Sequence, residues 1–338
     1  MQAAAVRAGS MSGLVPLPAS RALSPERAAA YLDRLDIRAA LLDGPTLATL
    51  TALCSAHCSR VAYENLDLHA DAGGPVPTPE LDPGLSADRI AGKKRGSYCF
   101  LLVDAFASLL TSLGFVVSMH TAGVGEDPLP AEKWGNHIVL LAHLADGPYI
   151  ADVGLGDGPS RPFALATHAW EEEGYHFSLE DRGGGVWRFT HDPLGSFDGF
   201  NVDISTSAAG AHEFADYHKF YWEDPSSNYR TAGLVLQRVC PGLGILTLRN
   251  CTLQRIHPRL PGGSTVLATA GSAEHLFALA LEHFLLPLSD LSNAQRSSLW
   301  GVAKAKHEAW LAAKRAGPCS KLTCSKLCSL LGHRLSGR

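Results

Sequence analysis

The sequence predicts an α+β protein in which helices come first, strands follow and a mixed segment ends the chain. Apolar residues recur with helical spacing between residues 24 and 113, whereas short apolar runs typical of strands dominate from Phe115 to about residue 249. The 338 residues are 46% hydrophobic and 18% charged, so a substantial core can be buried. No internal repeat is visible.

The first part of the chain is expected to hold three helices. Ser24 followed by Pro25 is a typical N-cap with proline at the first helical position, so a helix should begin there. The other two helices are expected at about 44–60 and 99–113. Residues 71–84 are rich in Gly and Pro and are expected to form a loop.

The remainder is expected to contain several strands and two further helices. The dipeptide Asp146-Gly147 is typical of a hairpin turn, so the strands on either side of it should pair. The expected strands are 115–117, 137–141, 149–153, 175–180, 186–190, 234–239 and 244–249, and the expected helices are 271–285 and 292–314.

Charge and composition narrow the class of protein. The net charge of -4 and the pI of about 6.4 argue against nucleic-acid binding, and apolar runs such as 138–142 are too short to span a membrane. The eight cysteines follow no zinc-ribbon or small disulfide-scaffold spacing. We therefore expect a cytoplasmic protein without a membrane partner, monomeric or weakly oligomeric. Residues 1–25, with arginines and no acidic residue, fit either a disordered tail or an organellar transit peptide.

Cys99 is the candidate nucleophile. A neutral thiol reacts poorly at pH 7, and enzymes activate it with a nearby imidazolium or a helix N-terminus. Cys99 lies where the turn Gly96-Ser97 enters the helix expected at 99–113, so the helix dipole favours its thiolate. Most buried cysteines are inert packing residues, which is the expectation for Cys54 and Cys58.

His137 and Asp152 are the candidate partners of this thiol. His137 opens one strand of the expected hairpin, and Asp152 lies within the other among apolar residues. If these strands pair, the carboxylate can lie beside the imidazole, fix its tautomer and stabilise its charged form. Taken singly, a strand histidine is usually only hydrogen-bonded and a strand aspartate often caps a turn.

Six short segments together resemble the arylamine N-acetyltransferase family. Around the nucleophile, Arg95-Gly96-Ser97-Tyr98-Cys99-Phe100 is similar to the family's RGG-aromatic-Cys signature. Asp152-Val153-Gly154-Leu155-Gly156 is similar to its Asp-x-Gly-x-Gly element. The remaining matches follow the family's order and are Tyr63-Glu64-Asn65-Leu66, Leu113-Gly114-Phe115, His137-Ile138-Val139-Leu140 and Asp224-Pro225-Ser226-Ser227-Asn228-Tyr229, with Gln237-Arg238 after them.

The resemblance implies both a fold and a reaction. The fold is an N-terminal helical bundle, a central β-barrel-like domain and a C-terminal α/β lid around a cysteine-protease-like Cys-His-Asp core. The reaction is a ping-pong transfer from acetyl-CoA to an arylamine or hydrazine through acetyl-Cys99, with His137 and Asp152 completing the catalytic triad. The resemblance implies acyl-CoA as a co-substrate, with no permanently bound cofactor and no metal.

The family's motifs also imply further contacts. Ser226, Asn228 and Tyr229 are candidate CoA contacts, although a simple Pro-Ser turn is equally typical of this segment. Val124 is a candidate wall of the acceptor pocket. Arg95 is expected to be structural, paired with a carboxylate such as Glu64.

The expected parts of the chain are a flexible tail over 1–22, a helical domain over 23–115 with the cysteine, a β-rich domain over 116–225 with the histidine and aspartate, an α/β lid over 226–316 and a Cys/Lys-rich tail over 317–338. Two alternatives to acetyl transfer stay open. A Cys-His-Asp triad also serves cysteine hydrolases and transglutaminase-like enzymes. In addition, Leu101 and Val103 are apolar where the family is often polar, and Ser97 replaces its second Gly, which fits an inactive member acting as a binding module.

Overall fold

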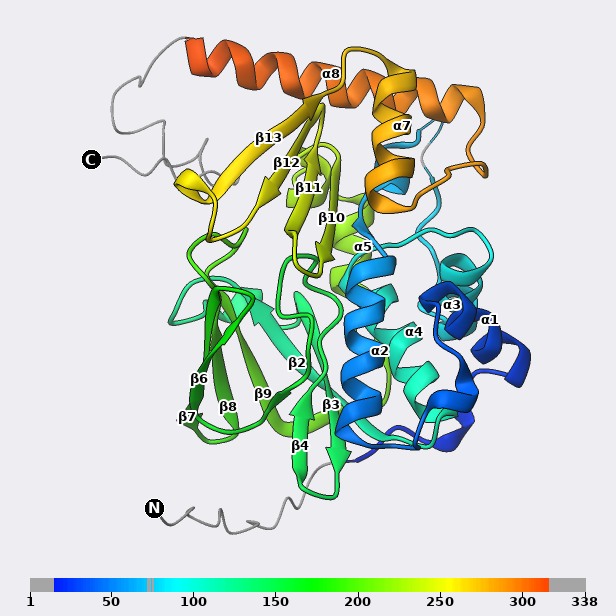
Figure 1. Cartoon of the computed structure of the whole chain (residues 1–338), viewed down its shortest axis with the longest axis vertical. Coiled ribbons are helices and arrows are strands. Elements are labelled where there is room, and N and C mark those ends of the chain that lie inside the picture. The colour runs from blue at the N-terminus through cyan, green and yellow to red at the C-terminus, as the bar shows by residue number, and fades with distance from the viewer. Residues whose placement is uncertain (1–14, 72–73, 75, 316–338) are drawn as a thin grey trace.

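Four helices form an N-terminal layer. The computed structural model describes residues 15–71, 74 and 76–315, and within them this layer comprises α1 (Pro25–Leu35), α2 (Leu47–Arg60), α3 (Pro83–Ala91) and α4 (Cys99–Ser112) (Figure 1). The three expected helices are confirmed: Ser24 caps α1, and every residue of α4 from Cys99 to Leu110 is buried.

Helix α3 was not expected. The sequence predicts a loop over 71–84 and no helix between that loop and Cys99. Asp82 caps α3 through its carboxylate, which accepts from the Leu85 N–H, and Pro83 takes the first helical position. This is the same signal that identified α1. It was overlooked because the helix has only nine residues and follows a Gly- and Pro-rich stretch.

An antiparallel sheet of eight strands forms the second layer, in the order β5-β4-β3-β2-β9-β8-β7-β6. Its two edge strands approach each other, since the Phe163 ring of β5 stacks 4.7 Å from the Trp170 ring of β6. The sheet is therefore strongly curled around a core that includes Phe177, Phe189 and Phe200 (Figure 1). The strands are β2 (Val116–Val124), β3 (His137–Leu144), β4 (Gly147–Ile150), β5 (Phe163–Ala164), β6 (His168–Glu172), β7 (Tyr175–Gly183), β8 (Val186–Thr190) and β9 (Gly199–Ala208).

Strands β3 and β4 form the predicted hairpin. Leu141 pairs with Ile150, and the ladder ends where the Ala151 N–H donates to the Leu140 carbonyl at 2.9 Å. Asp152 therefore lies just beyond β4 and not inside a strand ending at residue 153, as the sequence predicted. Irregular backbone after Ile150 gives its carboxylate the freedom to turn toward β3.

A second antiparallel sheet, β1-β10-β11-β12-β13, carries helices on one face. Its first strand comes from the N-terminal part, because Tyr63 pairs with Gln237. Leu236 and Leu248 pack against α7 (Ala273–Phe284) and α8 (Asn293–Arg315), at the top of Figure 1. The strands are β1 (Tyr63–Glu64), β10 (Val235–Cys240), β11 (Gly244–Arg249), β12 (Thr252–Ile256) and β13 (Ser264–Thr269), which confirms the expected strands near 234–239 and 244–249 and both C-terminal helices.

Short helices connect the two sheets and the helical layer. Helix α5 (Ala215–Glu223) and helix α6 (Asn228–Thr231) follow β9, and both contribute to the candidate site described below. Single 3-10 turns occur at Ala19–Arg21, Ala39–Leu41, Leu66–His69, Ala131–Lys133, Ala211–Phe214 and Pro261–Gly263.

The segment from residue 15 packs onto the fold, whereas a flexible tail through residue 22 was expected. Leu17 is buried and its N–H donates to the Val117 carbonyl at 2.8 Å. The guanidinium of Arg21 pairs with the buried carboxylate of Asp104 on α4, which holds the segment in place. Residues 1–14 and 316–338, with most of the expected tails and the expected transit segment, lie outside the described residues.

Candidate active site

Cys99 is the first residue of α4 and is almost fully buried, with 2% of its surface exposed. Tyr98 caps the helix in an extended conformation, and its carbonyl accepts from the N–H groups of Leu101 and Leu102 at 3.2 Å each. The sulfur is thus held at the positive end of the helix dipole, as the sequence predicted.

The structure brings His137 and Asp152 together beside this sulfur. The Nε2–H of His137 donates to Asp152 Oδ2 at 2.7 Å, and the second carboxylate oxygen accepts from the Gly154 N–H at 2.8 Å. The other imidazole nitrogen, Nδ1, is left free by Asp152, and the Cys99 side chain lies close enough to act on the charge of the ring. Burial opposes charge on His137, but the Asp152 carboxylate and the Cys99 sulfur outweigh it and raise its pKa to about 10. The imidazole is therefore charged at neutral pH.

Gly154 allows the segment after Asp152 to approach the nucleophile. A methyl group on Gly154 would lie 2.9 Å from Val103 Cγ2 and 3.0 Å from both Cα and Cβ of Cys99. These distances are shorter than ordinary carbon contacts, so only glycine fits between α4 and the loop. Gly156 has a φ of +81°, which glycine adopts without strain, and it lies against Tyr63.

A cluster of tyrosines surrounds the sulfur and was not predicted as part of the site. The hydroxyl groups of Tyr63 and Tyr229 are hydrogen-bonded, and the Tyr229 ring lies 5.0 Å from that of Tyr98 and 4.5 Å from that of Tyr221. Burial raises the pKa of all four phenols, and the neighbouring Cys99 charge raises it further. All four hydroxyl groups therefore stay protonated and able to donate.

The sequence held a signal for some of these tyrosines. Tyr63, Tyr98 and Tyr229 each fall in a segment quoted above for the family resemblance, at its aromatic position. Tyr221 falls in none of them, and it reaches the site only because α5 packs beside α6.

Arg95 is structural, as predicted. Its fully buried guanidinium pairs with Glu64 at 3.0 Å, with Asp67 at 2.7 Å and with Asp290 at 3.1 Å. These partners come from β1, from the 3-10 turn after it and from the loop before α8. Arg95 therefore ties the turn before Cys99 to segments from both the N-terminal and the C-terminal parts of the chain. These ion pairs offset the free-energy cost of burying the guanidinium.

Val124, the predicted wall of the acceptor pocket, lies close to His137. Its N–H donates to Asn136 Oδ1 at 2.8 Å, and the Asn136 amide donates back to its carbonyl at 3.1 Å. Phe200 pairs with Val124 across the sheet and its ring lies 5.8 Å from that of His137. One end of the curled sheet thus brings together Val124, Phe200 and His137.

The three predicted CoA contacts do not lie together as a group facing the sulfur. Ser226 and Asn228 are exposed, and the hydroxyl of Ser226 donates to Asp224 Oδ1 at 2.6 Å, which stabilises the turn. Tyr229 alone reaches the neighbourhood of Cys99. The intervening Ser227 is buried and caps α6.

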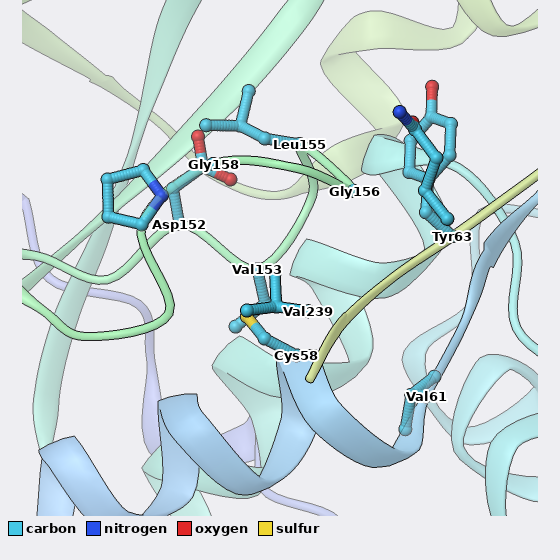
Figure 2. A pocket seen from close by; sticks show the side chains of 11 residues that line it. Cys58, Val61, Tyr63, Asp152, Val153, Leu155, Gly156, Gly158 and Val239 are labelled. Carbon is cyan, nitrogen blue, oxygen red and sulfur yellow. The ribbon is translucent and has the colours of Figure 1, made fainter. Parts of the chain in front are cut away.

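A small pocket lies beside Asp152 (Figure 2). It is lined by Cys58, Tyr63, Gly156 and Val239 among others, and in the view of Figure 2 Tyr63 and Asp152 lie on opposite sides of Gly156. Its volume of about 10 Å³ is room for about one water molecule. Cys58, expected to be only a packing residue, therefore borders the site.

Within the described ranges, no helix combines the length and the apolar character that crossing a lipid bilayer requires.

Comparison with known proteins shows which proteins this chain is similar to. A family model described as N-acetyltransferase matches residues 46–290. The arylamine N-acetyltransferase of Mycobacterium tuberculosis is 33% identical over 162 residues, which cover 45% of this chain and 54% of that protein. The N-malonyltransferase FDB2 of Fusarium pseudograminearum is 28% identical over 205 residues, covering 52% and 58%. The chain thus spans about half the length of these curated relatives.

The fold agrees with this match. The structure of Mycobacterium marinum arylamine N-acetyltransferase in complex with CoA superposes with a TM-score of 0.69, at 23% identity, over 81% of this chain and 99% of that one. The mixed helical and sheet architecture predicted above is therefore confirmed. Since the family model also matches more than half of the sequence, the chain belongs to the arylamine N-acetyltransferase family.

Proposed function

We propose that the protein is an acyl-CoA-dependent N-acyltransferase that moves an acetyl group from acetyl-CoA to an arylamine or arylhydrazine. The observation that carries the proposal is the buried set of Cys99, His137 and Asp152, with a charged imidazole beside a thiol at a helix N-terminus. Such a pair supplies a nucleophile, the thiol, and a general acid, the charged imidazole, side by side. Membership of the family and the CoA complex of the Mycobacterium marinum enzyme support the choice of donor.

The first half-reaction forms an acetyl-enzyme. The Cys99 thiolate attacks the thioester carbonyl, a bond forms between Sγ and the acyl carbon, and the bond to the CoA sulfur breaks. His137 gives its proton to the departing CoA thiolate. Backbone N–H groups at the start of α4 would stabilise the oxyanion, and in other enzymes one such donor contributes about 3 kcal/mol.

The second half-reaction returns the enzyme to its starting state. The amine nitrogen attacks the acyl carbon, the neutral imidazole of His137 accepts the amine proton, and Cys99 leaves as the thiolate. Asp152 holds the Nε2–H of His137 in both half-reactions, so that Nδ1 always faces the sulfur. Val124 would line the acceptor, and Tyr229, with Ser226 and Asn228, would contact CoA.

Incubation with acetyl-CoA alone tests the proposal. Intact-mass and peptide mass spectrometry should show one acetyl group on Cys99, free CoA released in equal amount, and loss of the label when an arylamine is added. Cys99→Ala should carry no label, and Cys251→Ala, as the matched control at a buried free cysteine in the core beneath α7 and α8, should be labelled normally. Peptide cleavage without labelling would instead support a hydrolase, and CoA binding without release would support an inactive binding module.

A further inference from the structure

One cation close to the candidate active site lacks a partner. Arg249 ends β11, opposite Val235 of β10 and Thr252 of β12. Its side chain is partly buried, and within the described ranges it makes no hydrogen bond and no ion pair. Arg95, by contrast, has three carboxylates around it.

The strand register places Arg249 on the face of the sheet that turns toward the site. Side chains alternate along a strand, so Arg249 shares a face with Thr247. On that face Thr247 pairs with Gln237 of β10, and Gln237 pairs in turn with Tyr63 of β1. Leu248 points to the opposite face, where it packs with α7 and α8. The charge of Arg249 acts on Tyr63, and so does that of Cys99, so Tyr63 links the two groups.

No hydrogen bond or ion pair among the described residues offsets the desolvation of this guanidinium. Burial lowers the pKa of Arg249, and the charges of Asp157 and Tyr63 oppose this effect. The carboxylate of Asp157 already accepts from the Ser196 N–H at 2.7 Å and from its hydroxyl at 3.1 Å. A buried cation without such a partner is costly unless an anion binds beside it.

The surroundings of Arg249 suit an anion with several oxygen atoms. The buried hydroxyl of Thr247 has no hydrogen-bond partner, and the amide of Gln237, only 4% exposed, makes no side-chain hydrogen bond within the described ranges. The Gln237 Oε1 lies against Gly156, the glycine of the loop after Asp152. Unused donors therefore line the face between Arg249 and the loop that holds the triad.

We propose that Arg249 is a specificity-determining residue that binds the carboxylate of a substrate reacting at Cys99. The proposal rests on the acyl transfer proposed above and names a class of substrate for it. A guanidinium binds a carboxylate through two parallel hydrogen bonds, which a neutral substrate cannot form. The carboxylate can belong to a dicarboxylic acyl group, such as a malonyl thioester, or to the ring of the accepting arylamine.

Four substrate pairs distinguish these two sources. Acetyl-CoA and malonyl-CoA are each combined with aniline and with 4-aminobenzoate, and kcat/KM is measured for the wild type, Arg249→Gln and Arg249→Lys. In Arg249→Gln the preference for the carboxylated member should fall at least tenfold, in the donor arm or in the acceptor arm, and Arg249→Lys should keep part of it. Because the preference is a ratio within one preparation, a loss of folded protein does not change it.

Arg255→Gln is the matched control. Arg255 lies on the adjacent strand, is also partly buried and has a buried Nε without a partner, but it pairs with Leu246 on the helix-covered face. Its substitution should leave both ratios unchanged. Equal ratios in the wild type and Arg249→Gln, in both arms, would overturn the proposal.

A binding measurement separates this proposal from the acyl transfer itself. Saturation-transfer NMR with 4-aminobenzoate, aniline and malonate needs no turnover. The wild type should bind the carboxylates in preference to aniline, and Arg249→Gln should lose that preference. A wild type that turns over no pair contradicts the proposed reaction, whereas unchanged carboxylate binding in Arg249→Gln contradicts the role of Arg249.

Discussion

A methyl group added at position 154 should both destabilise the fold and slow acylation of Cys99. In Gly154→Ala the new carbon would lie 2.9 Å from Val103 Cγ2 and 3.0 Å from Cα and Cβ of Cys99. Ordinary carbon contacts are about 3.5–4.0 Å, so the loop and α4 must separate by about half an ångström or more. Overpacking of this kind costs about 1–3 kcal/mol of unfolding free energy.

The displacement falls on the reacting groups themselves. The Gly154 N–H holds Asp152 Oδ1 at 2.8 Å, so movement of the loop also moves the carboxylate that orients His137. Misplacement of about 1 Å can cost roughly a hundredfold in rate, and half of that should cost at least about tenfold. Stopped-flow release of CoA measures this step directly, before any amine is added.

Gly301→Ala is the control for this experiment. Gly301 lies inside α8 with no atom within 4 Å of the added carbon, so alanine should stabilise the helix by up to about 1 kcal/mol without changing acylation. The reasoning about Gly154 is refuted if Gly154→Ala melts at the wild-type temperature and releases CoA at the wild-type rate.

Three further predictions concern the buried charges. Arg95→Gln should lower the unfolding free energy by about 3–5 kcal/mol in urea titrations, because Asp290 loses its cation and Glu64 and Asp67 keep only Arg89. The raised pKa of His137 stabilises the fold fully below about pH 6.5, and this contribution is lost as pH rises through about 10. Asp152→Asn should remove that alkaline loss, seen as a flatter pH dependence of the melting temperature. Arg21→Ala should cost about 3–5 kcal/mol by removing the cation beside the buried carboxylate of Asp104, and Arg21→Ala with Asp104→Asn should recover much of it.

Local sequence signals predicted the elements that carry the triad. Cys99 could be placed at a helix start because a Gly-Ser turn precedes a long apolar run, and the pairing of His137 with the segment of Asp152 followed from one turn dipeptide. Both depend on neighbours within about fifteen residues. The prediction that Asp152 lies within a strand was wrong, since β4 ends at Ile150. Apolar residues continue beyond the last pair of the ladder, so the sequence does not mark the end of the strand.

Contacts between distant segments could not be predicted in this way. The pairing of Tyr63 with Gln237 spans about half of the chain, and β1 is only two residues long, too short for any period to show. The meeting of Tyr63 and Tyr229 depends on that pairing, and so does the place of Arg249 beside Tyr63. These positions follow from tertiary packing and carry no local pattern.

The structure also weakens the reading of the chain as an inactive family member. Leu101 and Val103 were the main support for it, since both are apolar where the family is often polar. Both are buried in α4, and Val103 packs against Gly154 beneath the loop that holds Asp152. Each oxygen of Asp152 nevertheless has a partner, in His137 and in the Gly154 N–H, so neither bond depends on a polar side chain at position 101 or 103. These apolar residues leave the hydrogen bonds of Asp152 intact, which favours an active enzyme over an inactive binding module.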